Sequence, residues 1–204
     1  PPCTSASIAF DPPLRTFPDA TRGVTGLIAK HQQLVDDHNT LFDFTSEVIT
    51  HCDTRSVHWA LESCASRRRN NKANWPRYHR NGFVWDYPPI ERIFSTTTAR
   101  TRTTAQCQFQ ALWQKYTDVG SSGGANESFD TYFLDTDCSC ESHAVVLKGY
   151  DEHGIARTAV AGDYVPGFAS ALSHAIDDTC RSDKEGAGED GWEASLNRLS
   201  KEKL

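Results

Sequence analysis

The 204-residue sequence contains no methionine, even at position 1, and no run of 18 apolar residues. The missing methionine leads us to expect a mature chain whose leader has been removed, because the first residues do not have the basic-then-apolar layout of a signal peptide. The missing apolar run excludes a transmembrane helix. The HExxH and phosphate-loop motifs are also missing, which excludes the enzyme classes that those motifs define.

Positive charge is scarce over most of the chain, whose formal net charge is −6, and this balance disfavours nucleic acid as a partner. One stretch, 66–81, departs from the rest because it contains six basic residues and no acid. Basic residues interleaved with aromatic ones are typical of polyanion binding. An ordered loop folded on its own aromatics and a processing site are the alternatives. The candidate binding residues are Arg67, Arg68, Arg69, Lys72, Trp75 and Arg77.

Seven cysteines are present, which is many for a cytosolic protein that binds no metal. Cys138, Cys140 and His143 have a spacing that metal ligands can have, but no second ligand pair has zinc-finger spacing. We therefore expect disulfides in a secreted, extracellular protein, and no metal or other cofactor. The candidates for disulfides are Cys3, Cys52, Cys64, Cys138, Cys140 and Cys180. The sequon at Asn126 predicts a glycoprotein and agrees with secretion.

The apolar pattern predicts an α+β fold in a single domain, 1–204, with flexible or extended ends at 1–20 and 183–204. Two apolar series of period seven, which begin at Leu27 and Ile28, predict a long amphipathic helix over 24–51. We expect further helices at 55–66 and 103–116, a strand at 129–135, and a hairpin over 142–165 that turns at 151–154. We also expect two helices at the C-terminus. The strands should form a small antiparallel sheet, with helices before and after it in the sequence, and disulfides should staple the fold.

Three residues form a candidate catalytic site: Cys107, His143 and Asp163. Thiol catalysis needs a thiolate, an imidazole to form it and a polar group to orient the imidazole. Cys107 falls near the start of the expected helix 103–116, where the helix dipole would stabilise a thiolate. If the hairpin turns at 151–154, its return strand brings Asp163 beside His143.

This order of residues resembles transglutaminase-like and papain-like thiol enzymes over about 100–165. The segment QCQFQALWQKYTDVG is similar to the cysteine helix of the transglutaminase core, and SHAVVLKGYDEHG is similar to the histidine strand of papain-like enzymes. The resemblance implies that Cys107 is the nucleophile, His143 the base and Asp163 the group that orients it. It implies a protease, deamidase or transglutaminase acting on acyl groups of a protein substrate.

The composition as a whole resembles fungal secreted cysteine-rich effectors. That resemblance implies a virulence-type factor that binds a host protein, such as a protease, without catalysis. We expect this function, with the Cys-His-Asp thiol enzyme as the alternative. The two hypotheses differ in the state of Cys107, which is free in the enzyme and bonded or inert in the effector.

Overall fold

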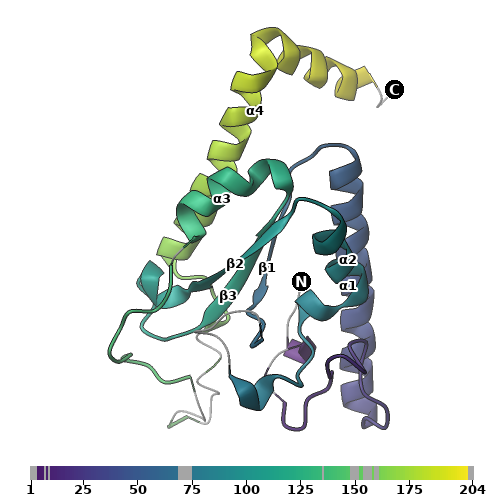
Figure 1. Cartoon of the computed structure of the whole chain (residues 1–204), viewed down its shortest axis with the longest axis vertical. Coiled ribbons are helices and arrows are strands. Elements are labelled where there is room, and N and C mark those ends of the chain that lie inside the picture. The colour runs from purple at the N-terminus through teal and green to yellow at the C-terminus, as the bar shows by residue number, and fades with distance from the viewer. Residues whose placement is uncertain are drawn as a thin grey trace.

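A computed structural model describes residues 4–6, 8, 10–68, 75–134, 136–147, 152–153, 158 and 161–201, with side chains as far as 183. Its centre is a three-stranded antiparallel sheet of β1 (Ala60–Cys64), β2 (Arg100–Ala105) and β3 (Tyr116–Ser121). Around the sheet lie α1 (Ala29–Thr54), α2 (Pro88–Thr96), α3 (Asn126–Phe133) and α4 (Pro166–Lys201), as Figure 1 shows. This arrangement confirms an α+β fold.

β3 is the central strand of the sheet, in the order β1-β3-β2. Ala60 lies opposite Ser121 in one pairing, and Ala105 lies opposite Tyr116 in the other. β1 and β2 are therefore parallel to each other, and both end at the same edge of the sheet. All six residues of β3 are buried, as expected for a strand that is paired on both sides and covered on both faces.

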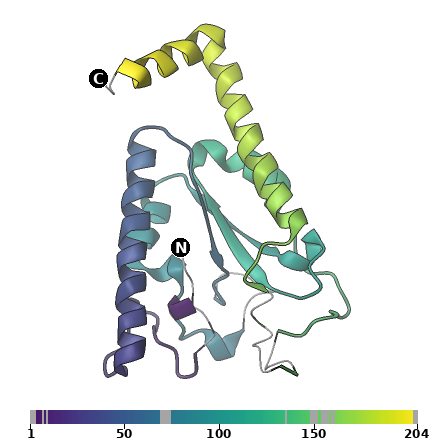
Figure 2. The same ribbon diagram turned by 180° about the vertical axis from the view of Figure 1, so that it is seen from behind.

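Helices cover both faces of the sheet (Figure 2). On one face, α1 and α2 enclose an aromatic core that includes Phe42, Trp85 and Tyr87, all nearly inaccessible to solvent. On the other face, α3 and α4 enclose a second core around Phe129, Phe133 and Phe168. Burial of such large apolar side chains contributes most of the stability of a fold of this kind.

The helix expected over 24–51 is confirmed as α1, and its two heptad series have different surroundings. Val35, Phe42 and Ile49 are buried in the core, whereas Leu41 and Val48 are exposed. His38 is also buried, and its Nδ1 lies 2.8 Å from the hydroxyl oxygen of Ser5. One apolar stripe therefore anchors α1 to the sheet.

Several other predicted elements were wrong. The segment 55–66 contains β1 instead of a helix, because pairing with β3 outweighs the helix propensity of its Ala, Leu and Glu. The segment 129–135 lies largely in α3, where Phe129 and Phe133 are one helical turn apart on the buried face. The segment 103–116 contains the end of β2, the 3-10 helix Gln106–Phe109 and the start of β3.

The C-terminal region forms one helix, α4, instead of the two expected. Of the predicted hairpin over 142–165, residues 148–151, 154–157 and 159–160 lie outside the described residues, and the described residues of this segment form no strand. Within the part of the chain that the structure describes, no helix combines the length and apolarity that crossing a membrane requires. No disulfide joins the six described cysteines, and Cys3 lies outside the described residues, so the predicted stapling has no support from the structure.

Candidate metal centre

Three cysteines and one histidine converge at the edge of the sheet where β1 and β2 end. The sulfur atoms of Cys107, Cys138 and Cys140 and a ring nitrogen of His143 all lie within 4.8 Å of one another. Tetrahedral zinc with Zn–S bonds of about 2.3 Å places its sulfur ligands about 3.8 Å apart. A contraction of an ångström or less would therefore bring all four atoms onto one ion.

The four residues come from two segments that backbone hydrogen bonds hold side by side. Cys107 lies in the 3-10 helix Gln106–Phe109, directly after β2. The other three ligands lie in the irregular segment 136–147, which follows α3. The N–H of Ala105 donates to the carbonyl oxygen of Thr136 at 2.8 Å, and the N–H of Val145 donates to that of Leu112 at 2.9 Å. These two bonds hold the segment near its two ends, on either side of Cys138, Cys140 and His143.

Cys138 is the hydrogen-bond acceptor at the centre of this cluster. Burial raises the pKa of its thiol, but hydrogen bonds from the backbone N–H of Cys140, from the thiols of Cys107 and Cys140 and from Gln114 outweigh burial and lower it. The sulfur also lies 3.4 Å from Nε2 of His143. N–H groups directed at a sulfur stabilise a thiolate, the form that ligates metals.

Cys107 has the opposite electrostatic character. Burial, followed by its hydrogen bond to Cys138, raises the pKa of the Cys107 thiol to about 12. Cys107 and Cys138 pack against a small core of Ala65, Ala105 and Tyr116, which shields this side of the cluster from water. A thiol with a raised pKa is protonated at neutral pH and becomes a thiolate when a metal displaces the proton.

The predicted catalytic trio is only partly assembled. Cys107 and His143 meet in the cluster, but Cys107 lies in a 3-10 helix after a strand instead of at the start of a long helix. Asp163 is exposed, and no hydrogen bond connects it to His143, although the structure describes both residues. The sulfur in contact with the imidazole is that of Cys138, a residue that the sequence analysis assigned to a disulfide.

The basic stretch 66–81 includes side chains that fold back on the protein's own aromatics and acids. Arg68 pairs with the buried Asp86 and lies 4.0 Å from the ring centre of Phe17. Arg67 lies 4.6 Å from the ring centre of Trp75. Arg77 pairs with the exposed Asp11 at 3.2 Å. Arg69 and Lys72 lie outside the described residues, and polyanion binding by this stretch stays a prediction.

Asn126, the predicted glycosylation site, is buried at the first turn of α3. Its Nδ2 donates a hydrogen bond to the carbonyl oxygen of Thr98 at 2.8 Å. Its Oδ1 accepts from Nη2 of Arg102 at 2.9 Å and from the hydroxyl of Ser121 at 3.0 Å. The amide nitrogen that would carry an oligosaccharide is therefore engaged in the interior of the folded protein.

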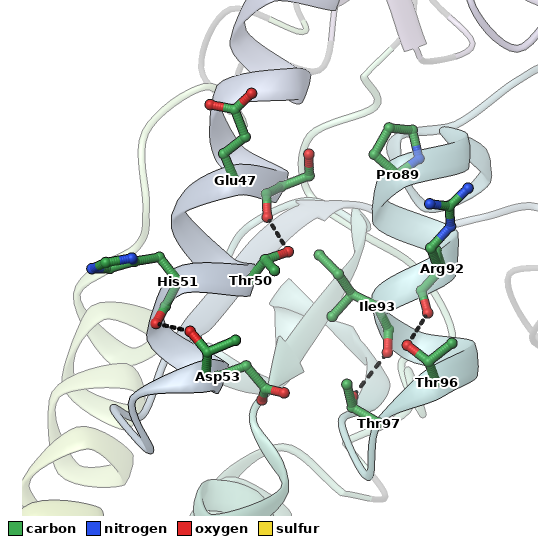
Figure 3. A pocket seen from close by; sticks show the side chains of 11 residues that line it. Glu47, Thr50, His51, Asp53, Pro89, Arg92, Ile93, Thr96 and Thr97 are labelled. Carbon is green, nitrogen blue, oxygen red and sulfur yellow. Dashed lines mark hydrogen bonds between the residues drawn. The ribbon is translucent and has the colours of Figure 1, made fainter.

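A cavity of about 610 Å³ lies between α1 and α2 (Figure 3). Its walls include the hydroxyl groups of Thr50, Thr54, Thr96 and Thr97, and each donates to a carbonyl oxygen of its own helix. Because these hydroxyl protons are already donated, the four threonines offer a ligand only acceptor oxygens. The cysteine-histidine cluster is the stronger candidate for function.

Comparisons of the chain with protein families, curated proteins and solved structures found no match. The function of the candidate site is therefore inferred from the chemistry of its own residues. Three of the four ligands, Cys138, Cys140 and His143, have recognisable spacing in the sequence. The fourth, Cys107, is separated from them in the sequence by β3 and α3, and only the fold brings it close to them.

Proposed function

We propose that this chain is a zinc-binding protein, in which Cys107, Cys138, Cys140 and His143 hold one ion. The observation that carries the proposal is the convergence of four ligand atoms within 4.8 Å of one another. Four protein ligands of the Cys₃His type complete a tetrahedral shell and leave no position for water. The ion would therefore have a structural role.

The donor atoms favour zinc over the other abundant cations of cells. Three thiolates and an imidazole are soft or borderline ligands, which select zinc, while magnesium and calcium prefer oxygen. The hydrogen bonds that the backbone N–H of Cys140 and the side chain of Gln114 donate to the sulfur of Cys138 supply the outer interactions that orient ligands in such sites. The exposed position of Cys140 gives the ion a path of entry from solvent.

Zinc would fasten the irregular segment 136–147 to the end of the sheet. This segment contains no helix or strand of its own, so side-chain and single backbone contacts hold it in place. One ion bound by both segments would cross-link them in the folded chain. Because the unfolded chain has no preformed site, the free energy of zinc binding would add to the stability of the folded state.

The secreted effector and the thiol enzyme remain proposals that compete with this one for the same cysteines. A cluster of reduced thiols is typical of a reducing compartment, whereas secretion favours disulfides. The contact between the thiol cluster and His143 supports thiol chemistry, while the raised pKa of Cys107 opposes its role as a nucleophile. Only the amino-acid composition of the chain supports the binding of a host protein.

The test is a titration of the reduced, metal-free protein with Co²⁺, which reports tetrahedral thiolate coordination by its visible absorption. We expect one ion per chain and displacement by an equivalent of Zn²⁺. Cys107→Ser should weaken binding strongly, and Cys180→Ser, which changes an exposed cysteine outside the cluster, should leave it unchanged. Equal binding by both variants would overturn the proposal.

A further inference from the structure

A second cluster of reactive side chains lies away from the metal centre, at the other end of β3. His58 precedes β1, Ser122 follows β3, and Asp183 projects from α4. Nδ1 of His58 lies 3.2 Å from the hydroxyl oxygen of Ser122, and Nε2 of the same ring lies 2.9 Å from Oδ1 of Asp183. One imidazole therefore bridges a buried hydroxyl and a carboxylate.

The hydrogen bonds fix the direction in which a proton can move through this cluster. The carboxylate of Asp183 can only accept, so it holds a proton on Nε2 of His58 and leaves Nδ1 as an acceptor. The backbone N–H of Trp59 donates to the hydroxyl oxygen of Ser122 at 3.4 Å. The hydroxyl proton of Ser122 is therefore directed at Nδ1, as a serine nucleophile requires.

An apolar cavity of about 380 Å³ opens beside the imidazole, between β1 and α4. His58 forms part of its wall, together with the apolar side chains of Val119, Ala125, Phe129, Leu172 and Ile176. Cavities of this size accept small ligands, and apolar walls select the apolar part of a ligand. The cavity therefore fits a small apolar group that lies against the imidazole of His58.

A glycine makes room for the imidazole. A Cβ atom on Gly124 would lie 2.4 Å from Cε1 of His58, a separation that real side chains do not adopt. The ring can approach Ser122 only because residue 124 has no side chain. A Gly124→Ala substitution should therefore displace the His58 ring without deleting any atom of Ser122, His58 or Asp183.

We propose that Ser122, His58 and Asp183 form a hydrolytic site for esters with small apolar acyl groups, independent of the zinc site. The hydroxyl oxygen of Ser122 attacks the ester carbonyl carbon, and its proton passes to Nδ1 of His58. The bond to the alcohol oxygen breaks, and that oxygen takes the proton. Water then attacks the acyl-serine carbonyl, its proton passes through His58 back to Ser122, and the free acid leaves. Asp183 acts as a positioning residue.

Two probes test the site on the full chain: hydrolysis of p-nitrophenyl butyrate, and covalent labelling by a fluorophosphonate with mapping by mass spectrometry. We expect label on Ser122, and a loss of kcat on the order of 100-fold in Ser122→Ala and His58→Gln. Asp183→Asn and Gly124→Ala should lower kcat and leave KM unchanged. Ser182→Ala and His174→Gln, matched controls on α4, should behave like the wild type.

A merely structural role for the three residues predicts a different result. His58 would then only fasten α4 to the sheet, and neither probe would react at Ser122. Absence of label from the folded protein, label of equal extent in His58→Gln, or acyl transfer mapped to Cys180, which also lines the cavity, would each overturn the proposal. Circular dichroism of each variant separates loss of reaction from loss of fold.

Discussion

The sulfur atoms of Cys107 and Cys138 lie within 4.8 Å of each other, and the two residues are separated in the chain by β3 and α3. This contact closes a loop between the end of β2 and the segment after α3. Cys140 and His143 complete the group of four ligand atoms around it. A zinc ion bound there would connect the sheet to a segment that has no regular secondary structure.

Removal of zinc is expected to destabilise the protein. At a free zinc concentration of 1,000 times the Kd, binding to the folded chain alone adds about 4 kcal/mol to the free energy of unfolding. Denaturant unfolding with and without a chelator measures this difference. Cys140→Ser should lose the chelator effect, whereas Cys52→Ser, outside the cluster, should keep it. A chelator effect that persists in Cys140→Ser would place the metal elsewhere.

Acid is expected to destabilise the fold partly through His38. Burial, followed by the nearby charge of Arg15, lowers the pKa of this imidazole below its usual 6.5. The folded state therefore binds a proton less readily than the unfolded state, and stability is lost as the pH falls from about 6.5 through the lowered pKa. His38→Gln should show a shallower loss than the wild type between about pH 7 and 5.

The control for this prediction is His153→Gln, which changes an exposed histidine. Loss of metal in acid affects all three proteins in the same way, so the difference between variants isolates the contribution of His38. Parallel stability curves for the wild type and His38→Gln would contradict the prediction.

We expect the ion pair of Arg102 and Asp130 to contribute measurably to the stability of the second core. Arg102 is only 4% exposed, and its guanidinium also donates to Ser121 and Asn126 at 2.9 Å. Removing one partner of a buried pair leaves the other charge uncompensated. Because Asp130 is partly exposed, we expect Asp130→Asn to cost about 2 kcal/mol of unfolding free energy. Asp177→Asn, on the exposed face of α4, should cost almost nothing.

Folded protein produced in a secretory host is expected to carry no glycan at Asn126. The amide nitrogen of Asn126 is bonded to Thr98 inside the protein, so an oligosaccharide there would block folding. Intact mass of the folded fraction measures this directly. Ser128→Ala, which removes the sequon but none of the hydrogen bonds of Asn126, should fold with unchanged stability. A folded fraction with hexosamine on Asn126 would contradict this account.

The sequence predicted the elements whose signal is local. α1 was recognisable because its apolar residues repeat every seven residues from Leu34 to Ile49, and this period needs no knowledge of the rest of the fold. β1 was missed because its residues favour a helix and only pairing with β3 makes them a strand. α3 was missed because phenylalanines four residues apart also fit a short alternating pattern.

Part of the candidate metal centre could be recognised in the sequence. The spacing of Cys138, Cys140 and His143 showed three possible ligands, but we interpreted the cysteines as partners in disulfides and expected no metal. Cys107 was singled out as a nucleophile. No local pattern connects it to the other three, because its place in the cluster depends on where β2 ends and how the segment after α3 returns to the sheet.

X-ray absorption at the zinc edge of the purified, reduced protein tests the central claim most directly. A site of Cys107, Cys138, Cys140 and His143 predicts three sulfur ligands at about 2.3 Å and one nitrogen ligand at about 2.0–2.1 Å. In His143→Ala the nitrogen contribution should disappear while the sulfur shell stays. A shell dominated by oxygen, or a folded protein that takes up no zinc, would contradict the account.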